Sequence, residues 1–253
     1  MGDVGLLLVG VVLFVNGLAA LGVVPARSAA PLNFFVGTAQ VVLPTLVLVQ
    51  SGSDPAVLAA TWPSYLFGIT YLWYGFQIIH GIEPQGFGWY SSFVAAVAAF
   101  HAVTSVGSDP VFAVIWATWA IMWTLFFLLM GLGLTHVGTL ELGRFTGWFL
   151  VWLGIPTCTV SALFLLEGRW STSATAGWAA LAGLAALTVL SVALARSDVA
   201  RSVVTDGVHD GDSRHDGVSA HGASAHGDQA GRTESPASAG ADAEEPALAT
   251  TRR

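Results

Sequence analysis

A stripe of aromatic side chains marks the segment that begins at Pro110. Large rings recur in it at intervals of four, three and four residues, at Phe112, Trp116, Trp119 and Trp123. This spacing places all four rings on one face of a helix. Such a face could wall a narrow apolar slot and still offer ring faces and indole N–H groups to a flat polar solute. Core packing between helices would use the same spacing, and both interpretations stay open at this point.

A second aromatic pair, Phe67 and Tyr71, has the i, i+4 spacing of one helical face. Tryptophan in membrane proteins often lies in belts at the two interfaces. The stripe from Phe112 to Trp123 covers about 16 Å at about 1.5 Å per residue, roughly half of the hydrocarbon thickness. A single interfacial belt therefore does not account for it.

Amide side chains form the second group that could do chemistry. They lie within or beside long apolar runs, at Asn16, Asn33, Gln40 and Gln77. An amide left without a hydrogen bond at membrane depth is costly. These side chains are therefore expected either to bond across helices or to contact a polar solute. The glycines Gly10, Gly17 and Gly37 would allow helices to approach closely.

Charged side chains are confined to the breaks between the apolar runs. Between residues 4 and 195 the only ones are Arg27, Asp54, Glu83, Asp109, Glu141, Arg144, Glu167 and Arg169. Pumps and proton-coupled transporters generally need ionisable groups inside the membrane, so a passive route for a neutral solute fits better. The sequence has no protease, hydrolase or nucleotide-binding motif. We expect no enzyme activity, cofactor, metal site or nucleic-acid partner.

Long apolar runs must position these groups. Hydrophobic residues make up 54% of the chain and charged residues 10%, which favours a membrane protein. A helix needs about 20 apolar residues to cross the hydrocarbon core. Seven segments qualify, at residues 4–24, 32–50, 56–79, 87–107, 111–134, 145–166 and 174–195. Since hydrocarbon cannot satisfy loose backbone groups, the sequence predicts an all-α integral membrane bundle.

Arginine placement predicts the orientation, because cytoplasmic loops collect basic residues. An N-terminus outside the cell places Arg27, Arg144, Arg196 and Arg201 in the cytoplasm. We divide the chain into a six-helix domain at residues 1–170, an additional transmembrane helix at 171–195, and a tail at 196–253. The tail is rich in Ala, Gly, Ser, Asp and His, so we expect it to be disordered. It is cytoplasmic if the seventh segment spans.

Short motifs in consistent order along residues 1–170 resemble the AmiS/UreI family of bacterial urea and aliphatic-amide channels. The matching positions are Val9-Gly10, Asn16-Gly17, Asn33-Phe-Phe-Val-Gly37, Phe67-Gly-Ile-Thr-Tyr-Leu72, Trp89-Tyr-Ser-Ser-Phe-Val94, Trp116-Ala-Thr-Trp-Ala-Ile-Met-Trp123 and Gly143-Arg-Phe-Thr-Gly-Trp148. The resemblance implies six helices per protomer, a homohexamer in the cytoplasmic membrane, an outside N-terminus and one pore in each protomer. It also suggests functional coupling to a cytoplasmic amidase or urease.

The resemblance also assigns residues to the pore. With Phe112 from the stripe and Asn16 as a polar contact, the expected lining is Leu6, Val9, Leu13, Asn16, Phe67, Tyr71, Phe112, Trp116, Trp119, Met122 and Trp123. Urea channels of the family carry an acidic residue where this chain has Leu153 before Gly154, so the chain looks closer to the amide branch. The short loop at residues 51–56 has no histidine, which argues against the acid gating of the urea branch.

The leading hypothesis from the sequence is therefore a passive channel for urea or short aliphatic amides, seated in the lipid bilayer. Two alternatives stay open. One is a membrane sensor that signals to a cytoplasmic partner through its C-terminal tail. The other is a proton-coupled amide importer, which the missing intramembrane carboxylates disfavour.

Overall fold

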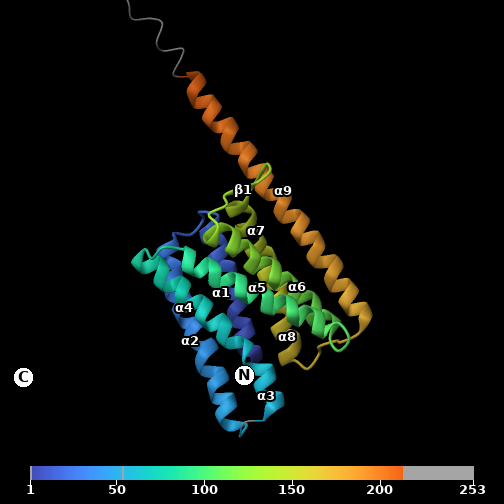
Figure 1. Cartoon of the computed structure of the whole chain (residues 1–253). Helices are drawn as coiled ribbons and strands as arrows, with labels where there is room; N and C mark the ends of the chain where they lie inside the picture. The colour runs from blue at the N-terminus through green and yellow to red at the C-terminus, as the bar shows by residue number, and fades with distance from the viewer. Residues whose placement is uncertain (1, 53, 213–253) are drawn as a thin grey trace, which may run out of the picture. The chain divides into compact units, whose positions relative to one another are not determined.

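The computed structural model describes residues 2–52 and 54–212, and side chains as far as residue 197. The described chain is almost wholly helical, as the apolar runs predict (Figure 1). The α-helices are α1 Gly2–Ala20, α2 Ala26–Gln50, α3 Pro55–Thr61, α4 Pro63–His80, α5 Gln85–Ser105, α6 Pro110–Phe126, α7 Leu142–Gly154, α8 Ser161–Leu166 and α9 Ala174–Asp212. Two π-helical turns, η1 Phe127–Gly131 and η2 Ile155–Val160, continue α6 and α7, and strands β1 His136–Val137 and β2 Leu140–Glu141 form a small hairpin.

Six helices of the described chain are long and apolar enough to cross a membrane. They are Gly2–Ala20, Ala26–Gln50, Gln85–Ser105, Pro110–Gly131, Leu142–Leu166 and Ala174–Ser197. The last of them is the additional seventh segment of the sequence analysis. Helix α4 has 18 residues, about 27 Å of helix, but its Tyr, Trp, Gln and His side chains make it less apolar. An all-α, multi-pass membrane protein is confirmed.

The third predicted segment, residues 56–79, is not one helix, and that prediction was wrong. It is divided into α3 and α4 at Trp62. Pro63 has no N–H to donate to the preceding turn, so the first helix ends there and a new one begins. Asp54 starts α3 as its N-cap, where its carboxylate accepts hydrogen bonds from the N–H groups of Ala56 at 2.8 Å and Val57 at 3.4 Å.

Helices of the bundle pack closely where glycines remove side chains. Helix α1 packs against α2 and α7, α2 against α4, and α5 against α6. A Cβ atom on Gly17 of α1 would lie 2.8 Å from the carbonyl oxygen of Gly147 in α7. On Gly37 of α2 it would lie 2.9 Å from the backbone nitrogen of Leu72 in α4. The expectation that these glycines allow close helix approach is confirmed.

Helix α9 runs past residue 195, where the sequence analysis placed the end of the last segment. It continues to Asp212, so residues 196–212, which we expected to be disordered, are helical. The disorder expected for residues 213–253 lies outside the described residues. Beside α5 and α6, residues 181–189 of α9 line an apolar groove of about 670 Å³.

Candidate functional site

An apolar cavity of about 270 Å³ lies between α1, α4, α5, α6, η1 and α7. A water molecule takes about 30 Å³ in the liquid, so the cavity has room for a small solute. Its lining consists of Leu13, Asn16, Ala20, Thr70, Tyr71, Tyr74, Phe87, Met122, Trp123, Phe126, Leu129, Met130, Gly143, Thr146 and Leu150. None of these side chains carries a formal charge, so the walls offer only neutral hydrogen-bonding groups.

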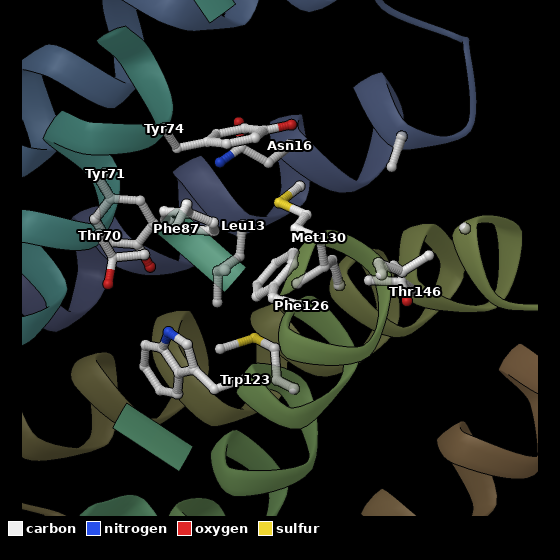
Figure 2. Close-up of a pocket in the computed structure, with 15 residues that line it drawn as sticks. Leu13, Asn16, Thr70, Tyr71, Tyr74, Phe87, Trp123, Phe126, Met130 and Thr146 are labelled. Carbon is white, nitrogen blue, oxygen red and sulfur yellow. The ribbon is translucent and has the colours of Figure 1, made fainter. Parts of the chain in front are cut away.

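Five residues that the sequence analysis assigned to the pore line this cavity. They are Leu13, Asn16, Tyr71, Met122 and Trp123, and they come from three helices that are far apart in the sequence. Figure 2 shows Trp123 at one end of the cavity and Thr146 towards the other. The nitrogen-bearing edge of the Trp123 indole faces the side on which Leu13 and Tyr71 lie (Figure 2).

An aromatic cluster adjoins the Trp123 end of the cavity. We define it as Phe67, Trp116, Trp119 and Trp123. The Phe67 ring stacks on Trp123 with centroids 5.1 Å apart and an angle of 8° between the planes. Trp119 meets Phe67 edge-on at 5.3 Å, and Trp116 meets Trp119 edge-on at 4.9 Å. Stacked and edge-on pairs are the favoured geometries of aromatic rings, so the cluster is a firmly packed wall.

The stripe predicted on α6 does not act as one unit. Trp119 and Trp123 are buried, whereas Trp116 is half-buried and stacks on His101 of α5 at 4.7 Å. Phe112 lies apart from the other three and packs against Trp170 at 4.8 Å. The indole of Trp170 donates a 2.7 Å hydrogen bond to Asp109, the N-cap of α6.

Two further positions expected in the pore lie on α1. Val9 is buried in the hydrophobic core, and Leu6 is half-buried against it. Neither lines the 270 Å³ cavity. Leu13 lies one helical turn beyond Val9 on the same face of α1. Val9 and Leu6 therefore extend the face of α1 that carries Leu13, in the direction away from the cavity.

Asn16 bonds across helices, which is one of the two roles that the sequence left open for it. Its side-chain amide donates to Asn33 at 2.9 Å and accepts from Asn33 at 2.8 Å, which joins α1 to α2. Asn33 also donates to the carbonyl of Ala29 at 3.0 Å. Asn16 lines the cavity as well. Each amide in the pair therefore satisfies the other, and Asn16 keeps one hydrogen and one lone pair free of that pairing.

The two buried indoles of α6 differ in their hydrogen bonds. The N–H of Trp119 donates to the Thr157 hydroxyl at 3.2 Å. Among the buried polar atoms of the described chain, the Trp123 Nε1 has no partner. An unpaired donor in an apolar site costs free energy comparable to a lost hydrogen bond. A solute oxygen in the cavity would relieve that cost at Trp123 and not at Trp119.

Several lining residues were missed from the sequence, among them Tyr74, Phe87, Phe126, Met130 and Thr146. Phe126 and Met130 follow Trp123 at intervals of three and four, so the stripe simply continues at its own spacing. Extending the pattern beyond Trp123 would have found them. Phe87 begins a segment in which Trp89, Tyr90 and Phe93 follow closely, so aromatic spacing alone does not single it out.

Comparison with known proteins places the chain among membrane transporters. Residues 1–169 match the family described as AmiS/UreI family transporter. The chain is 51% identical over 183 residues to the "Putative transporter protein AmiS2" of Rhodococcus erythropolis, covering 71% of this chain and 86% of the relative. It is 44% identical over 207 residues to the "Putative amidate substrates transporter protein" of Mycolicibacterium smegmatis, covering 80% and 94%.

A solved structure has the same fold. The Helicobacter pylori urea channel, determined in a closed state by electron cryomicroscopy, superposes with a TM-score of 0.60 at 30% identity. The match covers 68% of this chain and all of that one. The sequence identities confirm the expected family resemblance. They are higher with the two amide-type relatives, at 51% and 44%, than with the urea channel, at 30%. Since the family consists of transporters, the expectation that the chain is not an enzyme is also confirmed.

Proposed function

The chain belongs to the AmiS/UreI family of transporters, and on that premise we propose that it is a passive channel for short aliphatic amides or urea. The observation that carries the proposal is the cavity itself, whose wall is apolar and aromatic with a few neutral polar groups. The names of the relatives at 51% and 44% identity point to amide-type solutes more than to urea.

The cavity wall selects against ions. Moving an ion into an apolar site costs several kcal/mol even after relaxation, and the described wall holds no opposite charge to offset that cost. A neutral amide loses about 2–7 kcal/mol of hydration if it finds no partner. A few hydrogen bonds from the neutral polar groups of the wall offset much of this cost for the amide, whereas no charge in the wall offsets the cost for an ion. Passage is therefore open to small neutral polar molecules and closed to charged ones.

The route we propose passes the full set of positions expected from the sequence. The positions of this set that lie on α6 are, in order, Phe112, Trp116, Trp119, Met122 and Trp123. The aromatic cluster forms one wall of its narrow part, and a planar solute passes along that wall. Trp123 offers its unpartnered N–H to the solute carbonyl at the cavity end of the cluster. Passage then needs no ionisable group, in agreement with a passive mechanism.

The assembly and orientation we propose are a homohexamer in the bacterial cytoplasmic membrane with the N-terminus outside. Large apolar side chains on the bundle surface, such as Phe35, Phe93 and Phe100, are more than 60% exposed in the single chain, as expected of a surface that faces lipid or neighbouring protomers. Arg27 and Arg144 begin α2 and α7. They lie at the end of the bundle where the C-terminal part of α1 packs against the start of α7. We assign that end to the cytoplasm because cytoplasmic loops collect basic residues.

Stopped-flow measurements on proteoliposomes test the proposal. Vesicles that contain the purified chain should re-swell faster than empty vesicles in acetamide, and to a lesser degree in urea. The rates should be unchanged when the pH gradient is collapsed. Glycerol, which is not planar, is the matched comparison solute. Amide permeability no greater than that of empty vesicles would overturn the proposal.

Orientation is tested separately by cysteine labelling. The sequence has one cysteine, Cys158, and it is buried, so background labelling in intact cells should be low. We expect an impermeant maleimide to label the variant Ser51→Cys, at the end of α2, in intact cells. The variant Ser28→Cys, at the start of α2, should be labelled only after lysis. The reverse pattern would refute the outside N-terminus.

A further inference from the structure

Thr157 does not line the cavity, and it holds the Trp119 indole by a hydrogen bond. Thr157 belongs to η2, is 1% exposed and accepts the indole N–H of Trp119 at 3.2 Å. Its own hydroxyl proton is donated to the carbonyl oxygen of Leu153 at 2.6 Å. A hydroxyl has one proton to donate and two lone pairs. The indole N–H of Trp119 can only donate, and the Thr157 oxygen can accept it through a lone pair while its own proton bonds to Leu153.

The π-helical turn explains why Thr157 faces α6. Pro156 has no N–H, so the helical hydrogen bond from this position is missing, and the chain widens into a π-turn at residues 155–160. The Ser161 hydroxyl donates to the Pro156 carbonyl at 2.9 Å within this turn. Turns of this kind change which side chains face a neighbouring helix.

The bond fixes the ring orientation of Trp119 within the aromatic cluster. Trp119 is edge-on both to Phe67, at 82° and 5.3 Å, and to Trp116, at 82° and 4.9 Å. Rotation of the indole about its side-chain torsions would break the bond to Thr157 and leave a buried N–H unpaired. The hydrogen bond and the two edge-on contacts thus favour a single ring orientation.

We propose that Thr157 is a positioning residue that sets the size selectivity of the channel by holding the Trp119 indole in place. This inference rests on the proposed channel function and adds to it a residue outside the cavity wall. Trp119 then serves as a shaped wall whose N–H is occupied, while the N–H of Trp123 is the one that remains for a solute. In this proposal Trp119 determines which solutes fit by size, and Trp123 provides the hydrogen bond to the solute.

The test compares Thr157→Val with Thr157→Ser. Valine keeps the shape and removes the acceptor, whereas serine keeps the hydroxyl. We expect Thr157→Val to raise the permeability ratio of propionamide to acetamide by about threefold, since the ring it frees is held only by packing. Thr157→Ser should keep the wild-type ratio. Thr118→Val is the matched control, because Thr118 makes the same bond to a carbonyl four residues back, at 2.9 Å, and lines the groove beside α9.

A double-mutant cycle links the effect to the indole N–H. Trp119→Phe removes the N–H, so it should raise the ratio on its own, and Thr157→Val should add nothing in that background. This second variant keeps the test decisive even if Thr157→Val fails to fold. An unchanged ratio in both variants, an equal change in Thr118→Val, or an undiminished effect of Thr157→Val beside Trp119→Phe would each overturn the proposal.

A spectroscopic measurement separates failure of this inference from failure of the proposed function. The resonance Raman band of indole that reports N–H hydrogen bonding can be compared between the wild type and Thr157→Val in detergent, without any transport. We expect the difference spectrum to show one indole that loses a hydrogen bond. If wild-type vesicles show no amide flux but the band shifts, the channel function fails and the bond stands. No band shift overturns the positioning role.

Discussion

The reciprocal amide pair between Asn16 and Asn33 gives the sharpest prediction for stability. The two side chains exchange hydrogen bonds at 2.9 and 2.8 Å, and they are 7% and 0% exposed. Replacing either with leucine leaves the other amide without its partner inside the bundle. Interhelical hydrogen bonds in membrane proteins contribute about 0.6 kcal/mol on average and about 1.7 at most. Two of them give an expected coupling energy of about 1–2 kcal/mol.

The assay is a double-mutant cycle on the free energy of unfolding, measured by titrating the purified protein with a denaturing detergent. Asn16→Leu, Asn33→Leu and the double variant complete the cycle. We expect the double variant to lose less stability than the sum of the two single variants. The reason is that the second substitution removes an amide that the first has already left unpaired.

The matched control pairs Asn16→Leu with Gln40→Leu. Gln40 also joins α2 to α1, but it donates to the carbonyl of Gly5 at 3.4 Å and shares no partner with Asn16. Its effect should add to that of Asn16→Leu within about 0.5 kcal/mol. A coupling energy between Asn16 and Asn33 below that same limit would refute the reasoning, because it would mean that the pair contributes nothing beyond its separate residues.

Trp123→Phe keeps a ring that stacks on Phe67 but removes the unpartnered N–H. Acetamide flux in proteoliposomes should therefore fall about threefold, with unchanged thermal stability. A flux equal to that of the wild type would show that this N–H does not bind the solute. Gly17→Leu puts a side chain where even a Cβ atom would lie 2.8 Å from the Gly147 carbonyl oxygen. The free energy of unfolding should fall by about 2 kcal/mol or more in the same detergent titration. Gly2→Leu is the control, because a Cβ atom at Gly2 would meet nothing within 4 Å. Removing residues 196–253 should leave amide flux at the wild-type level, and a loss of flux would favour a role for the tail.

The membrane fold could be predicted because it follows from the distribution of apolar and charged residues along the sequence. Apolar runs of about 20 residues and the lack of charge within them leave a helical bundle as the solution. What composition could not show is where a helix is interrupted. Pro63 divides the third run, and Pro156 lies in a π-turn in the sixth. A proline does not mark an interruption by itself, because Pro31 and Pro44 lie inside the continuous helix α2.

The candidate site was predictable in part for a similar reason. Periodicity identifies the face of α6 that turns inward, and the resemblance added the face of α1 with Leu13. Periodicity does not say what lies opposite each ring. Phe112 has the spacing of the stripe, yet its neighbour is Trp170, which lies far along the chain. Partners of this kind are set by tertiary packing between helices, which a single sequence does not encode in its spacing.

Trp119 and Trp123 show what the structure adds to the stripe. They are four residues apart, share one face of α6, and are equally buried at 3% and 2%. By type, spacing and burial they are interchangeable. The Thr157 hydroxyl distinguishes them, since it occupies one indole N–H and leaves the other unpaired. A free donor beside a cavity without charged groups favours a neutral carbonyl oxygen as its partner, and an occupied donor makes its ring a fixed wall. The difference between the two rings therefore depends on one residue of another helix.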